Sequence, residues 1–156
     1  NNNQININVF LNEKCKDALN INDFINKIHI GMSELDYATN KGLIEGVSNI
    51  LAKNLNQMEI EKRPIHCTDV ENKILYIKDQ NEWNKDNEQI VTDTIKNVKD
   101  KHIEAMEKWE NENPDWKKNN NQTDKYIELI KKSTEELDEA ERNKVLDAVS
   151  KETEIK

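Results

Sequence analysis

Residues 63–86 read RPIHCTDVENKILYIKDQNEWNKD, and this stretch decides the fold class. Pro64 lacks a backbone N–H and disfavours helical backbone at the preceding residue, so the helix before it is expected to end by Arg63. In the extended segment that follows, neighbouring side chains point to opposite faces. Ile65 and Cys67 are therefore predicted to face the core together, with His66 on the other side.

The second half of this stretch predicts a β-hairpin over about 73–85. Residues 74–77 (ILYI) are strong strand formers, and residues 79–81 (DQN) provide turn chemistry before the chain returns. An isolated hairpin is only marginally stable in water, so one of its faces must lie on helices. Tyr76 and Trp83 are the residues expected to anchor it there.

The chain before the hairpin contains one expected strand and one strong helix. Ile5, Ile7 and Val9 alternate with polar residues, which is the period of a half-buried strand. Apolar residues recur at helical spacing over 41–58, which predicts a core helix. The predicted fold class is therefore α+β and predominantly α-helical, with several helices packed around a small antiparallel β-hairpin and with an N-terminal strand.

The longest predicted helix spans about 87–112 and ends at Asn113-Pro114. Asp86 and Gln89 resemble a capping box at its start. Its apolar seam has alternating spacings of four and three residues, a heptad-like pattern that could pair with a second chain. The seam consists of Val91, Ile95, Val98, His102, Ala105 and Trp109.

A C-terminal helical extension is expected over 115–156, after a main core over 13–114 and an Asn-rich lead with its strand over 1–12. Tyr126, Ile127 and Ile130 are predicted to face inward from its first helix. Ser133 and Glu136 form a capping-box pattern, which predicts the start of the last helix.

The composition favours one polar, intracellular domain. The chain has 156 residues, 35% of them charged, and a net charge of −8, which is too well patterned for wholesale disorder. Lys96, Lys99 and Lys101 alternate with acidic residues and are interpreted as a solvated face. Two cysteines, no signal peptide and no membrane-length apolar run indicate a reducing compartment and no membrane partner. Because the chain begins at Asn1 without Met, it is expected to be a fragment of a longer protein.

His66 and Cys67 are the most reactive pair of neighbours in the sequence. With Cys15 they are weak candidates for a metal site, and a thiol beside an imidazole could also act as a nucleophile. Side chains that point to opposite faces cannot easily converge on one metal, so a buried structural role is favoured. No catalytic residue and no cofactor is therefore predicted.

A helix followed by a hairpin and another helix also resembles a winged-helix module that binds DNA or RNA. Lys73, Lys78 and Lys85 of the hairpin are the candidate phosphate contacts. Neighbouring acidic residues leave this segment close to neutral, which disfavours nucleic-acid binding.

Three strings, INVFLNEKCKDALNINDFI (7–25), GLIEGVSNILAKNLNQM (42–58) and the 63–86 stretch, carry a family resemblance. The chain resembles a family of uncharacterised proteins encoded by giant nucleocytoplasmic large DNA viruses (mimivirus-like). In that family, such a region follows a zinc-finger segment and often a coiled-coil stretch. The resemblance implies a C-terminal domain of a zinc-finger nucleic-acid-binding protein in host cytoplasm or the virus factory, and possible presence in the virion. Nucleic acid would then be bound through the region upstream.

The leading functional hypothesis is a non-enzymatic module for self-association or protein–protein interaction, as a homo-oligomer or with a viral or host protein. It rests on the unpaired edge of the N-terminal strand and on the heptad-like seam. The expected contacts are Ile5, Ile7, Val9, Val91, Ile95, Val98, His102 and Trp109. The winged-helix reading is the alternative, and a metal protein or enzyme centred on His66 and Cys67 is the third.

Overall fold

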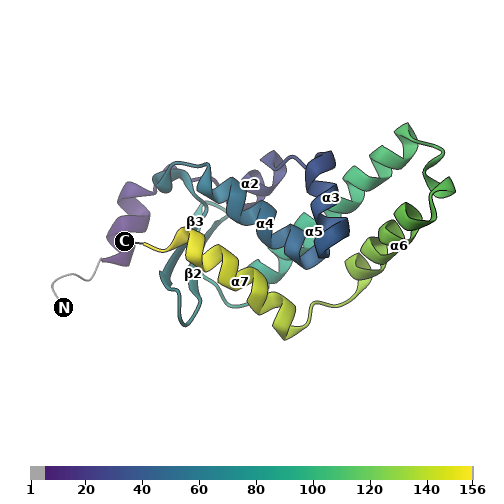
Figure 1. Cartoon of the computed structure of the whole chain (residues 1–156). Helices are drawn as coiled ribbons and strands as arrows, with labels where there is room; N and C mark the ends of the chain where they lie inside the picture. Colours follow the sequence, from purple (N-terminus) through teal and green to yellow (C-terminus); the bar gives the residue numbers. More distant parts are fainter. Residues whose placement is uncertain (1–5, 156) are drawn as a thin grey trace.

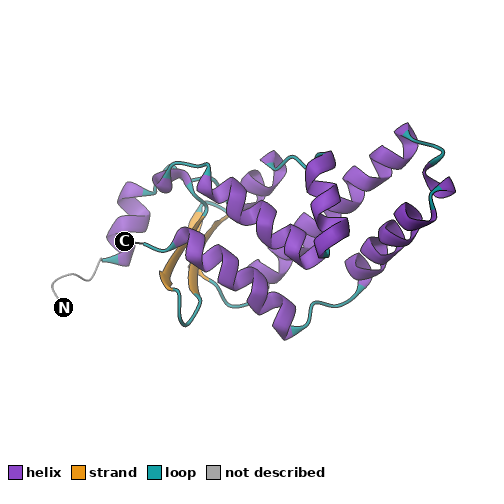
Figure 2. Ribbon diagram, viewed as in Figure 1, coloured by secondary structure: helices purple, strands orange, loops and turns teal. Residues whose placement is uncertain are grey.

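A three-stranded sheet lies at one end of an elongated helical body, and the first and last described segments of the chain lie at that same end (Figures 1 and 2). The computed structural model describes residues 6–155. The predicted fold class, α+β and predominantly helical, is confirmed. The helical elements are α1 (Ile7–Val9), the π-helix η1 (Phe10–Lys14), α2 (Ile21–Lys27), α3 (Met32–Lys41), α4 (Leu43–Asn56), η2 (Ile60–Lys62), α5 (Gln89–Glu112), η3 (Trp116–Lys118), α6 (Asn120–Thr134) and α7 (Glu139–Thr153).

The predicted hairpin is present as β2 (Ile74–Asp79) and β3 (Glu82–Lys85). Its two turn residues, Gln80 and Asn81, both have positive φ, at 50° and 65°, as the tight turns that match strand twist require. Asn20 binds this turn from the start of α2, because its Oδ1 accepts from the Asn81 N–H at 2.7 Å.

The segment after Pro64 forms a third strand, β1 (Ile65–Asp69), which pairs antiparallel with β2 in the order β1-β2-β3. The alternation predicted for it is confirmed, because Ile65 and Cys67 belong to the buried hydrophobic core. Leu75 and Ile77 of β2 share that face, since Ile65 pairs with Ile77 and Cys67 with Leu75.

The sequence predicted that Tyr76 and Trp83 anchor the hairpin on helices; they lie on the face of the sheet that is turned away from the hydrophobic core and α4. They alternate with the core residues Leu75 and Ile77 and so belong to the other face of the sheet. There the Trp83 ring lies 5.6 Å from the His66 ring, centroid to centroid. The N-terminal segment covers this face, and Phe10 makes an edge contact with His66 at 5.1 Å.

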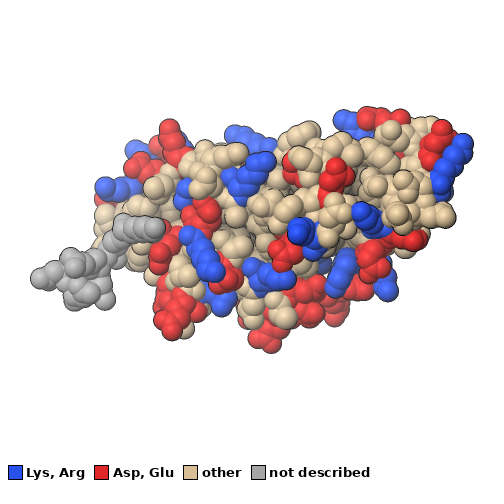
Figure 3. Space-filling model, in the orientation of Figure 1, with Lys and Arg blue, Asp and Glu red and all other residues tan. Residues whose placement is uncertain are grey.

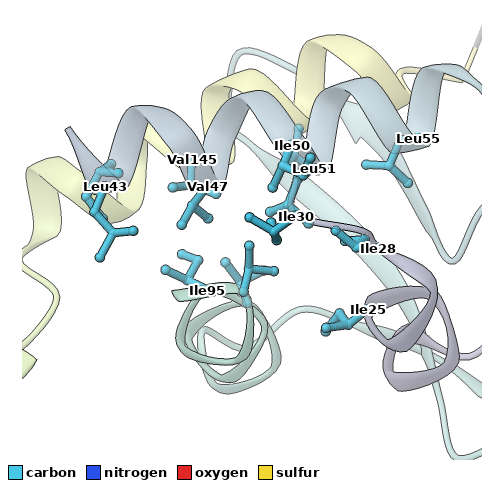
Figure 4. Close-up of a cluster of buried hydrophobic side chains, with 14 of the residues drawn as sticks. Ile25, Ile28, Ile30, Leu43, Val47, Ile50, Leu51, Leu55, Ile95 and Val145 are labelled. Atoms are coloured by element: carbon cyan, nitrogen blue, oxygen red, sulfur yellow. The ribbon is translucent and has the colours of Figure 1, made fainter. Parts of the chain in front are cut away.

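The core is built on α4, with α5 and α7 packed against it (Figure 4). The predicted helix over 41–58 is observed as α4, and its apolar stripe is buried except at Met58, which is partly buried. α4 and α7 run side by side in the same direction: Glu45 pairs with Lys144 near their first turns, and Asn56 bonds to Glu152 near their last turns. The C-terminal segment is thus part of the main core, to which Val145, Leu146 and Val149 contribute.

Close packing of α3, α4 and α5 depends on Gly46 of α4. A Cβ atom at this position would lie 2.9 Å from the Ala38 Cβ and 3.3 Å from His102 Nε2. His102 itself is fully buried, and its Nδ1 bonds to the Val98 carbonyl at 2.9 Å. The histidine in the seam is therefore a core residue of this chain.

The predicted N-terminal strand is wrong over the residues described. Ile7 and Val9 are in α1, which Asn6 caps by accepting from the Val9 N–H at 3.2 Å; Ile5 lies outside the described residues. Asn is a strong N-cap residue, and the strand pattern had no partner strand to pair with, so local capping outweighs the alternation.

Two predictions for the C-terminal helices are also wrong. Tyr126 is buried as predicted, but Ile127 and Ile130 are 54% and 40% exposed, and Leu129 takes the inward position. The last helix does not start at Ser133, whose hydroxyl donates to the Ile130 carbonyl within α6. It starts after Asp138, which forms a capping box with Glu141.

None of the helices in the part of the chain that the structure describes combines the length and apolar character needed to cross a membrane.

Candidate functional site

A groove of about 470 Å³ lies where the N-terminal helical segment meets the end of α7. We call it the terminal groove. Its walls come from the N-terminal helical segment, η2, the start of β1 and the C-terminal end of α7. The lining residues are Phe10, Asn56, Ile60, Arg63, His66, Lys151, Glu152, Thr153, Glu154 and Ile155.

An exposed isoleucine stands in the wall of the terminal groove. Ile60 is 59% exposed because η2 is a single short turn between α4 and Pro64, which leaves its side chain outside the core. Phe10 and Ile155 add apolar surface to the same groove. Apolar side chains on a concave surface are typical of sites that bind another molecule.

The charges of the groove are balanced. Arg63 and Lys151 stand against Glu152 and Glu154, although the whole chain carries −8. The Arg63 guanidinium donates from Nη1 to the Glu152 carbonyl at 3.0 Å, which ties η2 to α7, while its buried Nε has no partner among the described residues. Basic and acidic groups are also interspersed over the face shown in Figure 3.

His66 reaches the groove from β1, with Cys15 packed against it. The distance from Cys15 Sγ to His66 Nε2 is 3.6 Å, and both side chains are fully buried. The sequence thus named both residues as candidates, and the fold brings them together where the N-terminal helical segment packs on the sheet. Cys67 lies on the opposite face of β1, in the hydrophobic core, and does not join them.

The electrostatics of this pair oppose nucleophilic chemistry. Burial, reinforced by the nearby Glu61 carboxylate and partly offset by Lys78, raises the pKa of Cys15 to about 11. Burial and the Arg63 charge, partly offset by the Ile60 carbonyl, lower the pKa of His66 to about 4. At neutral pH the pair is a thiol beside a neutral imidazole, whereas a reactive cysteine needs an accessible thiolate.

The described residues contain no group of three or more His, Cys, Asp or Glu side chains placed to hold a metal ion. Cys15 and His66 supply two potential ligands, and Cys67 faces away from them. A structural zinc site takes four ligands and a catalytic one three. Within the described residues, Cys15 and His66 therefore supply fewer ligands than either kind of zinc site uses.

The exposed edge of β1 is occupied by the end of the described chain. Glu154 forms a parallel bridge with Cys67, and the Ile155 N–H donates to the Cys67 carbonyl at 2.9 Å. This backbone pairing beside the groove shows that the edge of β1 accepts an extended segment.

The seam predicted for partner contacts is used inside this chain. Four of its residues are buried in the core, and Trp109 packs edge-on against Tyr126 with 5.0 Å between ring centroids. Because their side chains are buried, those four positions are closed to a second chain, which corrects the prediction for them; Trp109 is partly buried. The four buried residues are Val91, Ile95, Val98 and His102. Of the other predicted contacts, Val9 is exposed and Ile7 is partly buried.

The hairpin lysines do not form a common patch. Lys78 is only 7% exposed, and its ammonium donates to the carbonyls of Lys16 and Ala18 at 2.8 and 2.9 Å. It is therefore withdrawn from any phosphate. Lys85 lies opposite Tyr76, towards the other end of β2, and Lys73 is in the β1–β2 turn.

Sequence reasoning missed the terminal groove. Ile60 lies in EIEKRP, whose charged neighbours predict a solvent-exposed segment, and this alone could have marked it as an exposed apolar residue. The approach of Phe10 and of residues 151–155 depends on tertiary packing, which carries no local signal. No family model, curated protein or solved structure matches this chain.

Proposed function

We propose that this chain is a protein-interaction module that self-associates through the terminal groove. The main support is that the exposed Ile60 lies beside a concave surface that also contains Phe10 and Ile155. A two-fold interface needs a projection and a recess within the same patch, and this patch has both. Ile60 of one copy would enter the groove of the other.

The charge balance of the groove supports this mode. A chain with a net charge of −8 repels its own copies at most contacts. In the groove the two basic and two acidic side chains allow opposite charges to meet across the two-fold axis. The biological setting that we propose, a large-DNA-virus protein with a nucleic-acid-binding region upstream, comes from the sequence resemblance alone.

Self-association is tested by light scattering and sedimentation at increasing concentration. The chain is expected to form dimers, and Ile60→Asp is expected to shift it to monomers because it places a charge in the contact. Ile127→Asp is the matched control, since Ile127 of α6 is 54% exposed and lies outside the groove.

Three results would count against the proposal. A strictly monomeric chain at high micromolar concentration would remove self-association. Dimers that survive Ile60→Asp would remove the groove as the contact. Dimers that are lost with Ile127→Asp but kept with Ile60→Asp would transfer the contact to α6.

A further inference from the structure

A second pocket, of about 400 Å³, lies between α5 and the connection from α6 to α7. We call it the α5 pocket. One wall is the α5 stripe at spacing i, i+3, i+4 and i+7, and the other is the segment 133–137. Its lining residues are Thr92, Ile95, Lys96, Lys99, Ser133, Thr134, Glu135, Glu136 and Leu137. Its volume falls in the range of about 300–1,000 Å³ typical of small-molecule sites.

Lys99 is the unusual residue of this pocket. It was predicted to be solvated, yet it is only 5% exposed. Among the described residues, the Nζ of Lys99 has no hydrogen-bond or ion-pair partner. It is nevertheless not completely shielded, unlike the buried side-chain atoms that lack a partner, such as Ser48 Oγ. Its ammonium is therefore accessible from the α5 pocket, which its side chain lines, while the rest of the side chain is buried.

Lys78 provides the comparison within the same chain. It is equally buried, and its ammonium is satisfied by two backbone carbonyls. Burying an ammonium without a hydrogen-bond partner is energetically unfavourable, and at Lys78 the two carbonyls remove that penalty. Although Glu135 and Glu136 also line the α5 pocket, no described carbonyl or carboxylate bonds to the Lys99 ammonium, and an external anion would supply that partner.

The other lining residues indicate which chemical groups that anion would contain. The Thr92 hydroxyl accepts from Arg142 Nε at 3.4 Å, so its own hydrogen is free to donate to a carboxylate beside Lys99. Leu137, which is partly buried, supplies apolar surface, and Ile95, only 1% exposed, lies directly beneath the lining. The hydroxyl hydrogens of Ser133 and Thr134 are bonded to backbone carbonyls, which leaves their oxygens as acceptors for an N–H group.

We propose that the α5 pocket binds a small carboxylate with a branched apolar body and an adjacent N–H donor, the chemistry of an apolar amino acid or its N-acyl derivative. The carboxylate pairs with Lys99 and Thr92, the apolar body packs on Ile95 and Leu137, and the N–H donates to Ser133 or Thr134. Glu136 favours an amine over an amide at this end, because a carboxylate attracts a positive charge.

The test is a titration of the whole chain with three probes, followed by NMR of the isoleucine methyl groups. N-acetyl-leucine has all three features, leucine adds the ammonium, and leucinamide lacks the carboxylate. The first two are expected to shift the Ile95 methyl signals, and leucinamide is expected to bind about tenfold more weakly, since a hydrogen bond to a charged group contributes about 1.5–3 kcal/mol.

Lys99→Met keeps the length of the side chain and removes its charge. It is expected to abolish the preference for the carboxylate probes, while the control Lys96→Met, at an exposed lysine of the same wall, changes their affinity by less than about threefold. Stronger binding of leucine than of N-acetyl-leucine would identify a free amino acid, and the reverse an N-acylated one.

Two results would overturn the proposal. One is equal binding of leucinamide and leucine, which differ only at the carboxyl end, to the wild-type chain. The other is no methyl shift with any probe up to about 20 mM, a concentration that exceeds a millimolar dissociation constant. Both are measured on the wild-type chain, so neither depends on the folding of Lys99→Met.

Discussion

His66 links the burial of one side chain to the pH dependence of folding. Its pKa is about 4 in the folded chain, against an ordinary value of 6.5. Between these values the unfolded chain binds the proton and the folded chain does not, so unfolding is favoured as the pH falls. His102 acts in the same sense, because burial lowers its pKa as well.

The free energy of unfolding is therefore expected to be roughly constant between about pH 7 and pH 8, below the pH at which the unfolded thiol of Cys15 ionises, and to fall between pH 6.5 and pH 4. The contribution of His66 is on the order of 3 kcal/mol, from about 1.4 kcal/mol per unit of pKa. Urea unfolding at several pH values measures it. His66→Gln should flatten part of the slope, and an unchanged slope would show that His66 is not responsible.

Single residues also explain where local prediction failed. Ile127 and Leu129 are both strong helix residues of similar hydrophobicity, and only packing against α3 and α5 decides which faces inward. Lys99 lies in a run of charged residues whose local pattern favours solvent. Its burial results from the 133–137 segment, which is remote in sequence and folds over it.

At the scale of elements, the start of α7 depends on Asp138. Its carboxylate accepts from the Glu141 N–H at 2.7 Å, and the Glu141 carboxylate accepts from the Asp138 N–H at 3.3 Å. Asp138→Ala is expected to lower the free energy of unfolding by about 1 kcal/mol. Ser133→Ala should change it little, since Ser133 is in the last turn of α6.

Chemical denaturation of both variants at neutral pH measures the difference. A larger loss of unfolding free energy for Ser133→Ala than for Asp138→Ala would contradict the role of Asp138 and would support a helix start at Ser133, as the sequence predicted.

Elements with a strong local signal were predictable from the sequence. The helix-stopping Asn113-Pro114, the turn at Gln80-Asn81 and the stripe of α4 are local features, and α5, β2, β3 and α4 are observed where they indicated. The conformation of the N-terminal segment could not be predicted in this way, because a strand needs a pairing partner and no local pattern shows whether one is present. The same limit applies to the site: Cys15 and His66 could be listed as candidates, but their contact is made by the fold.

At the scale of the whole molecule, Arg142 connects α7 to the junction between β3 and α5. Its Nη2 lies 3.3 Å from Asp86 Oδ2, and both side chains are largely buried. Burial raises the pKa of Asp86, and the N–H groups of Val91 and Glu88 and the Arg142 charge counter that effect. Without Arg142, a buried carboxylate would remain without its charge partner.

Arg142→Met is therefore expected to lower the free energy of unfolding by about 1–3 kcal/mol at pH 7. Lys151→Met is the matched control, because the Lys151–Asp147 pair is exposed at 68% and 46% and should contribute less than about 0.5 kcal/mol. Equal losses in the two variants, measured by urea unfolding, would contradict the role of Arg142.

The side-by-side packing of α4 and α7 also sets when this chain can fold. Nearly a hundred residues separate Asn56 from Glu152, its partner near the far end of the helix pair. During synthesis, α4 leaves the ribosome long before the helix that covers it, and its apolar stripe stays open until α7 follows. Native contacts of such wide sequence separation form late, so a nascent chain stalled before residue 139 would expose the α4 stripe to chaperones.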